Sequence, residues 1–187
     1  MFLEYGYGLA SLDIIAREAR VAKRTIYQYF GDKAELFGAV IRRLNDKVLL
    51  PLPQLETDTR PIAAQVLTDF ADRLLTMVLS PEAIQLYRIV VGEAGRFPEL
   101  AKQFYHNAPA HVLSSLTHYL ERQTELGYLH PIDATIAAEQ FLNMVLGEPH
   151  RRVLLGIDQI PDPEQIRRRV DHAATLFLNG CHGVPSD

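Results

Sequence analysis

The sequence has a single cysteine, Cys181, and no long uninterrupted apolar segment. One cysteine cannot form an internal disulfide framework, and such usage is typical of a reducing compartment. No apolar run approaches the roughly 18–20 residues that a membrane-spanning helix needs. The start of the chain also lacks the cationic segment and adjacent apolar stretch of a secretory signal peptide. These absences predict a soluble, cytoplasmic protein without a membrane partner.

An overall positive charge is also missing, since the formal net charge is −4. The charges are unevenly distributed, however. Residues 1–47 contain eight Lys and Arg against six Asp and Glu, whereas the rest of the chain contains eleven against seventeen. An acidic body would discourage its faces from binding DNA. If the protein binds nucleic acid, the sequence therefore predicts binding through its first 47 residues.

Residues 9–37 have the pattern of two short helices joined by a tight turn and followed at once by a third. Ser11 is expected to cap the first helix, whose apolar residues recur at i, i+3, i+4 and i+7. Gly31 is expected to end the second helix. Residues 32–35, Asp-Lys-Ala-Glu, form a capping box that opens the third.

The second helix of this group, residues 22–30, has a narrow apolar face made by Ile26 and Phe30. Its opposite face carries Arg24 and Gln28, flanked by hydroxyl-bearing side chains. Residues 17–33 contain five cations, namely Arg17, Arg20, Lys23, Arg24 and Lys33. A cationic, hydroxyl-rich outer face suits contact with a phosphate backbone.

This region resembles the DNA-binding helix-turn-helix of the TetR family of transcriptional regulators. The resemblance is carried by Gly6, Tyr7, Ser11, Ile15, Ala16, Ala19, Val21, Thr25, Ile26, Tyr27, Tyr29, Phe30, Lys33, Glu35, Leu36 and Phe37. The turn departs from the family pattern, because Arg20 stands where the family usually has glycine. A left-handed backbone at a non-glycine residue costs on the order of 1 kcal/mol, so we expect a slightly strained turn.

The resemblance implies that the second helix enters the major groove of a palindromic double-stranded DNA operator. The residues that would meet DNA are Ser11, Lys23, Arg24, Thr25, Tyr27, Gln28, Tyr29 and Lys33. Lys33 would hold a phosphate at the start of the third helix. Ser11 would place a backbone N–H on another phosphate.

The remainder of the chain shows helical periodicity and no alternating strand pattern, so we predict an all-α fold. Pro51, Pro53 and the polar residues that follow break the pattern. They predict a helix-turn-helix domain at residues 1–48, a linker at 49–60, and a ligand-binding and dimerisation domain at 61–187. Further helices are expected to be split near Pro109 and bent near Gly147.

Residues 86–127 resemble the AefR-like C-terminal domain of TetR-type regulators, chiefly through Glu93 to Leu100 and the turn at Gly127, Tyr128 and Leu129. The resemblance implies a regulator, most often a repressor, that acts as a homodimer and answers to a small effector. The last two long helices carry more apolar surface than one small body needs, so we place the dimer interface there.

A mostly apolar pocket for a small hydrophobic effector is predicted from residues that recur on inward helix faces. They are Phe70, Met77, Tyr87, Arg88, Phe104, His111 and Phe141. Arg88 would orient a polar group of the ligand. The alternative is that these side chains simply fill a close-packed core.

Metal and catalytic sites are not indicated by the sequence. The seven histidines show no metal-ligand spacing, and no nucleophile, base and orienting group stand together, so we expect neither a cofactor nor an enzyme. Two other classes stay open. One is an all-α enzyme, and the other is a helical ligand-binding or interaction module that has lost DNA binding.

The short N-terminus motivates the second alternative. The family's first helix supports the helix-turn-helix, and only Phe2, Leu3 and Tyr5 remain here to do so. Their burial, at about 1.5–3 kcal/mol each, is nearly cancelled by the entropy of ordering the first residues, at about 1–2 kcal/mol apiece. We therefore expect residues 1–8 to fray, DNA binding to be weak, and the true start to lie upstream.

Overall fold

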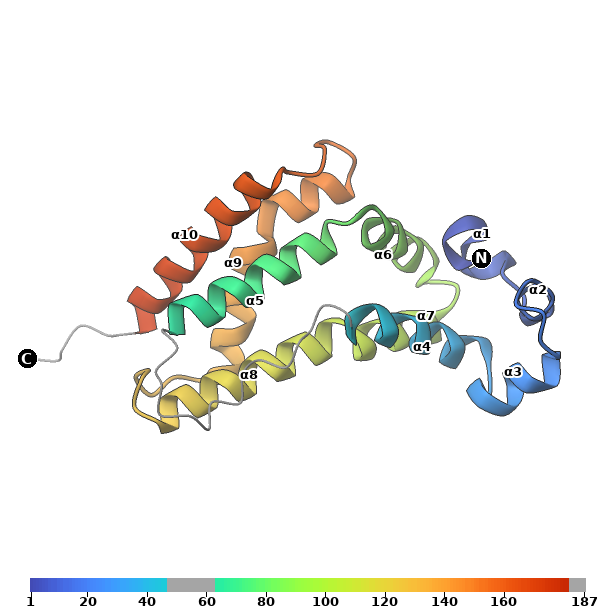
Figure 1. Ribbon diagram of the computed structural model, residues 1–187, viewed down its shortest axis with the longest axis horizontal. Helices are drawn as coiled ribbons and strands as arrows, with labels where there is room; N and C mark the ends of the chain where they lie inside the picture. The colour runs from blue at the N-terminus through green and yellow to red at the C-terminus, as the bar shows by residue number, and fades with distance from the viewer. Residues whose placement is uncertain (47–62, 182–187) are drawn as a thin grey trace, which may run out of the picture. The chain divides into compact units, whose positions relative to one another are not determined.

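The structure is a computed structural model that describes residues 1–46 and 63–181. Within these ranges it contains helices and no strand, which confirms the all-α class (Figure 1). The helices are α1 (Phe2–Leu9), α2 (Leu12–Glu18), α3 (Lys23–Phe30), α4 (Lys33–Asp46), α5 (Ala63–Val78), α6 (Pro81–Glu93), α7 (Pro98–Asn107), α8 (Pro109–Glu125), α9 (Ala134–Leu154) and α10 (Pro163–Cys181). The predicted linker and the last residues of the chain lie outside the described residues.

Side-chain caps begin several of these helices. Ser80 Oγ accepts a hydrogen bond of 3.2 Å from the Ala83 N–H at the start of α6. Asp162 and Gln165 form a reciprocal capping box at the start of α10, with N–H···O distances of 3.0 and 2.8 Å. Each cap satisfies an N–H that has no partner within the helix, and so fixes where the helix starts.

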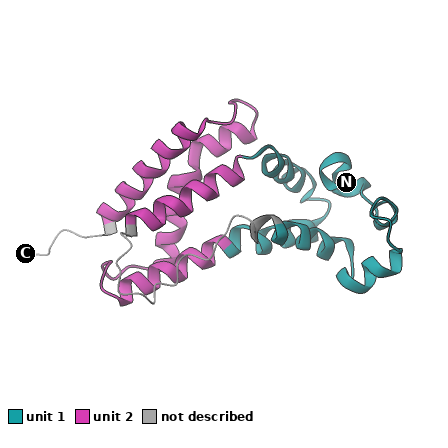
Figure 2. Cartoon of the chain, viewed as in Figure 1, with its two compact units in different colours: residues 1–47, 80–111 teal, residues 48–79, 112–187 magenta. Residues whose placement is uncertain are grey.

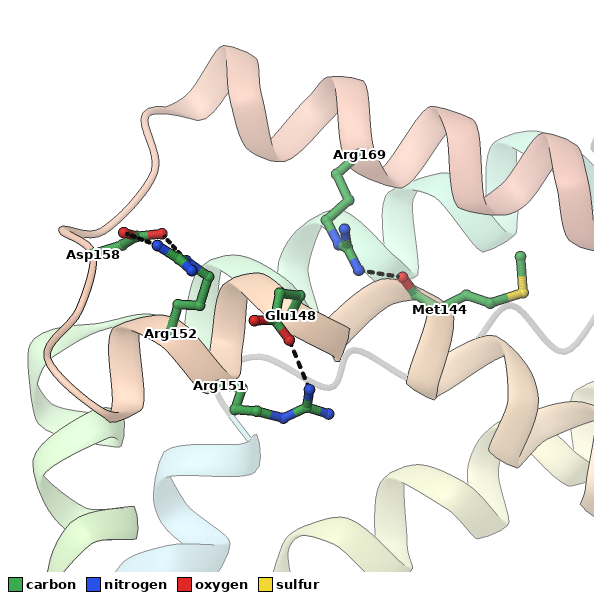
Figure 3. A network of polar contacts seen from close by, with 6 residues as sticks. All are labelled: Met144, Glu148, Arg151, Arg152, Asp158 and Arg169. Carbon is green, nitrogen blue, oxygen red and sulfur yellow. Dashed lines mark hydrogen bonds and ion pairs between the residues drawn. The ribbon is translucent and has the colours of Figure 1, made fainter.

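Both predicted helix interruptions are confirmed. Ala108 leaves helical geometry just before Pro109 and separates α7 from α8. In α9 the break falls at Gly147, whose φ is 36°, two residues before Pro149. Arg169 of α10 reaches this break and donates a hydrogen bond of 2.8 Å to the Met144 carbonyl oxygen (Figure 3). It donates a second bond, of 2.7 Å, to the Val145 carbonyl oxygen. The bonds satisfy carbonyls that a continuous helix would otherwise bond itself.

The chain forms two compact units, coloured separately in Figure 2. Unit 1 comprises residues 1–47 and 80–111. In it α1 packs on α6, and α4 packs on α7. Its core consists of Phe2, Tyr7, Ala10, Phe37, Ile41, Leu86, Val90 and Leu100. Helices α6 and α7, which the sequence assigns to the C-terminal domain, therefore pack with the helices of the predicted DNA-binding domain.

Unit 2 comprises residues 48–79 and 112–187. Its closely packed helix pairs are α5 with α10, α9 with α10, and α5 with α9. Buried side chains on these helices include Leu67, Phe70, Leu75, Phe141, Val145, Val170 and Phe177. No described helix is by itself both long and apolar enough to cross a membrane, although α5 and α6 meet the length and composition criteria as a broken pair.

Candidate nucleic-acid interface

The junction between α2 and α3 is a tight turn closed by backbone hydrogen bonds. The Val21 N–H donates to the Ala16 carbonyl at 3.0 Å, and the Arg20 N–H donates to the Arg17 carbonyl at 3.1 Å. This pair of bonds is the Schellman motif, which needs a left-handed residue at its centre. Arg20 is that residue, with φ at 56°. The strained, non-glycine turn predicted from the sequence is therefore confirmed.

Helix α2 is held at its start by Ser11, whose Oγ accepts from the Ile14 N–H at 3.3 Å. Helix α3 packs on it through one buried side chain, Ile26, which contacts Leu12 and Ala16. A helix of eight residues with one buried side chain gains little from burial on its own. Its position depends on the turn and on the start of α4.

The outer face of α3 is highly accessible. The Tyr27 and Tyr29 side chains are 47% and 77% exposed, which is unusual for large rings that folding alone would bury. Arg24 and Gln28 are exposed as well, and Thr25 is half-buried. Among the described residues no carboxylate pairs with Arg24, so its guanidinium is available to a phosphate or a base edge. The predicted reading face is thus exposed and polar.

Lys23 lies at the start of α3 and is already paired. Its Nζ donates to Asp13 of α2 at 2.9 Å and lies 5.7 Å from the centre of the Tyr27 ring. The hydrogen bond with Asp13 raises the pKa of Lys23. The sequence did not indicate this pair, which links α2 to α3 and would have to open or share its charge if Lys23 also met a phosphate.

Lys33 is less available than the sequence suggests. Its Nζ donates to the Gly8 carbonyl at 3.4 Å and lies 4.2 Å from the centre of the Tyr7 ring. Burial lowers its pKa, and Glu93 and Glu99 partly oppose this effect. The half-buried side chain of Lys33 thus supports the connection between α1 and α2, and its phosphate contact stays a prediction.

Helix α6 also supports this connection, through a contact that the sequence did not predict. The Gly8 N–H donates to the Glu93 carboxylate at 3.2 Å. A Cβ atom at Gly8 would lie 3.1 Å from the same carboxylate, so glycine allows the close approach. Tyr7 packs edge-on against Phe37 and Phe97, with ring centres 5.6 and 5.3 Å apart. Contacts across more than eighty residues of sequence leave no local signal.

The predicted effector-pocket residues fall in both units. Tyr87, Arg88, Phe104 and His111 belong to unit 1, and Phe70, Met77 and Phe141 belong to unit 2. In unit 1 the Tyr87 and Phe104 rings pack edge-on, with centres 5.6 Å apart, while Arg88 and His111 are exposed. In unit 2 the Phe141 ring lies 5.0 Å from that of Phe177. That the seven share one cavity stays a prediction.

A groove in unit 2 runs along α10 and the loop before it. It has a volume of about 1510 Å³, and Leu75, Met144, Ile160 and Leu176 are among its lining residues. Pockets for small molecules usually measure about 300–1,000 Å³. The groove contains none of the seven predicted pocket residues and is wide for a small ligand. Among the described residues, no group of three or more potential metal ligands stands together.

Two family models match the chain. Residues 1–40 match the N-terminal domain of the bacterial regulatory proteins of the tetR family. Residues 65–180 match the C-terminal domain of AefR-like transcriptional repressors. The chain belongs to the TetR family. This TetR-family protein is therefore a transcriptional regulator with a DNA-binding helix-turn-helix. The proteins of this family are regulators and not enzymes.

Solved structures share the fold over nearly the whole chain. The flavonoid-responsive regulator FrrA is 32% identical, with a TM-score of 0.78, and the match covers 100% of this chain and 92% of that one. A TetR-family regulator from Mesorhizobium loti is 25% identical, with a TM-score of 0.79 and coverage of 96% and 90%. The regulator HbdR of Aromatoleum is 38% identical over 63 residues, 33% of this chain and 28% of that protein.

Proposed function

We propose that this TetR-family regulator is a cytoplasmic, ligand-responsive repressor that binds a palindromic operator as a homodimer. The observation that carries the proposal is the outer face of α3, where Arg24, Tyr27, Gln28 and Tyr29 are exposed beside a basic turn. Exposed tyrosines and an unpaired arginine on a short helix suit the major groove, whose base edges accept and donate hydrogen bonds. The match to AefR-like repressors supports repression.

Dimerisation through the last two helices is supported by apolar side chains that unit 2 leaves exposed. Ile136 lies on α9, Leu176 lies on α10, and Leu155, Ile157 and Ile160 lie between these helices; all five are exposed. A dimer interface along these helices would remove such side chains from water. A two-fold interface would give the dimer two copies of α3, and half-sites would then lie at least roughly 34 Å apart.

For the effector, we propose a small, mostly apolar aromatic molecule held by the C-terminal helices. FrrA is described as flavonoid-responsive, which supports compounds of that chemistry as the first to try. Among the predicted pocket residues, Phe70, Met77 and Phe141 of unit 2 would contact the effector. Ligand binding would favour an arrangement of the helices in which the two copies of α3 no longer fit the operator.

A selection from a random duplex library tests this function most directly. We expect the full chain to enrich one palindromic sequence and its affinity to fall steeply as salt is raised. Light scattering at micromolar concentration should give a dimer. Binding without any enriched sequence, or no binding at all, would favour the alternative of an interaction module that has lost DNA recognition.

A further inference from the structure

One polar atom of unit 2 is buried without a partner. Tyr119, on the inward face of α8, is 5% exposed. Its hydroxyl has no hydrogen-bond partner among the described residues. Buried hydroxyls nearly always have a partner, because an unpaired hydroxyl loses its bonds to water and gains nothing in return. A phenylalanine would fill the same space without that loss, so the hydroxyl calls for a reason.

The other buried side chains of α8 are mostly apolar. Val112, Leu116, Leu120 and Gln123 are buried on the same helix. Gln123 is one helical turn beyond Tyr119 and therefore on the same face. A tyrosine and a glutamine among leucine and valine form a short polar strip on an otherwise apolar wall. Ligand pockets have this composition, in which a few polar groups fix the orientation of an apolar molecule.

The protonated hydroxyl of Tyr119 carries a donor hydrogen, and no acceptor among the described residues takes it. Burial raises the pKa of Tyr119 to about 12, so the hydroxyl keeps its proton at physiological pH. The buried polar side chains described in unit 2 besides Tyr119 are Thr68 and Gln123, which are both neutral. A ligand carboxylate buried at this hydroxyl would therefore have no buried cation to pair with, and burying an unpaired charge is strongly unfavourable. An uncharged carbonyl oxygen fits the site better than an anion.

We propose that the Tyr119 hydroxyl is the hydrogen-bond donor that orients the effector, and that the effector is a neutral, mostly apolar molecule with a carbonyl oxygen. This inference rests on the proposed ligand response of the protein. Tyr119 is not one of the seven pocket residues that the sequence predicts.

The test compares two probes that differ in one group. They are flavone and the analogue in which a methylene replaces the flavone carbonyl, each titrated calorimetrically into the full chain. We expect the parent to bind flavone more tightly than the analogue, by on the order of tenfold. Tyr119→Phe should remove this preference and leave the affinity for the analogue unchanged. Tyr105→Phe, an exposed tyrosine of α7, is the matched control and should keep it.

Several results would overturn the inference. Tyr119→Phe could keep the full preference for flavone, or the parent could bind neither probe. The variant could also melt at a lower temperature than the parent, which would show that the hydroxyl bonds to an internal water. A different result would contradict the proposed function itself: flavone would bind to the parent without releasing the selected operator. If the parent and Tyr119→Phe release the operator equally with both probes, the function stands and this inference fails.

Discussion

The ammonium nitrogen of Lys33, the first residue of α4, lies 4.2 Å from the centre of the Tyr7 ring. The same nitrogen donates to the Gly8 carbonyl, and Glu93 accepts the Gly8 N–H. The connection between α1 and α2 is thus held from α4 and from α6. Since α2 carries α3 through Ile26, the position of the reading face depends on these contacts.

Lys33→Ala should reveal both roles of this lysine. Losing a phosphate contact should weaken binding to all DNA sequences alike and reduce the slope of log affinity against log salt by about one. Losing the contact with Tyr7 should also lower the free energy of unfolding by about 0.5–2 kcal/mol. Filter binding over a salt series and chemical denaturation measure the two effects. Lys102→Ala, an exposed lysine of α7, is the control. An unchanged slope would make Lys33 a structural residue only.

Arg24→Ala and Tyr27→Ala should each weaken operator binding by about 1–3 kcal/mol, because each removes a group that reaches base edges or phosphates. Both side chains are exposed, so the fold should be unaffected. Gel-shift titrations with the selected operator give the affinities, and circular dichroism checks the helix content. Tyr105→Ala is a control of similar exposure outside the interface. Parental affinity in both α3 variants would show that α3 is not the reading helix.

The helix boundaries near the interface could be predicted because their causes are local. Ser11 and Asp32 each accept a hydrogen bond from a backbone N–H three residues ahead. The left-handed turn at Arg20 was predicted from the resemblance to the TetR family, because Arg20 stands where the family usually has glycine. Short-range chemistry of this kind is written in the sequence itself.

The supports of the interface could not be predicted, because they join residues that are far apart in the chain. Glu93 bonds Gly8 across 85 residues, and Lys33 bonds Gly8 across 25. The sequence suggested Phe2, Leu3 and Tyr5 as the supporting side chains. The structure confirms Phe2, which is buried, and packs Leu3 partly buried against the same core, but it leaves Tyr5 exposed and buries Tyr7. The break at Gly6, where φ is 75°, turns the chain so that Tyr7 rather than Tyr5 faces the core.

Arg20→Gly should raise the free energy of unfolding by about 1 kcal/mol, because glycine adopts the left-handed backbone without strain. Arg20→Ala keeps the strain and removes the same charge, so the difference between the two variants isolates the backbone effect. For a chain of this length, 1 kcal/mol corresponds to roughly 2–4 °C in Tm. Scanning calorimetry measures it. Equal Tm values for the two variants would mean that the turn relaxes away from the left-handed conformation.

Hydrogen exchange should show that residues 1–8 open more readily than the other helices. Helix α1 has eight residues and is broken at Gly6, so few of its backbone bonds support one another. Burial of Phe2 and Tyr7 at about 1.5–3 kcal/mol each is opposed by the ordering of the first residues at about 1–2 kcal/mol apiece. Mass-spectrometric exchange on the full chain gives the rates, with α9 as the internal reference. Amides of Leu3 and Tyr5 as slow as those of α9 would contradict the expectation.

The break in α9 should depend on the pair formed by Gly147 and Arg169. A Cβ atom at residue 147 would lie 2.5 Å from Arg169 Nη2, and φ there is 36°. Gly147→Ala should therefore lower the free energy of unfolding by roughly 1–3 kcal/mol. Arg169→Met should lower it by about 1–3 kcal/mol, because the carbonyls of Met144 and Val145 lose their donor.

The double variant distinguishes a mutual restraint from two independent defects. Removing Arg169 also removes the clash with a side chain at residue 147. The double variant should therefore lose less free energy of unfolding than the two single variants lose together, by at least about 0.5 kcal/mol. Urea denaturation of the four proteins measures this coupling. Arg168→Met, an exposed arginine on the same helix, should have little effect and should add fully with Gly147→Ala. Full additivity with Arg169→Met would show that the α9 break holds its shape without α10.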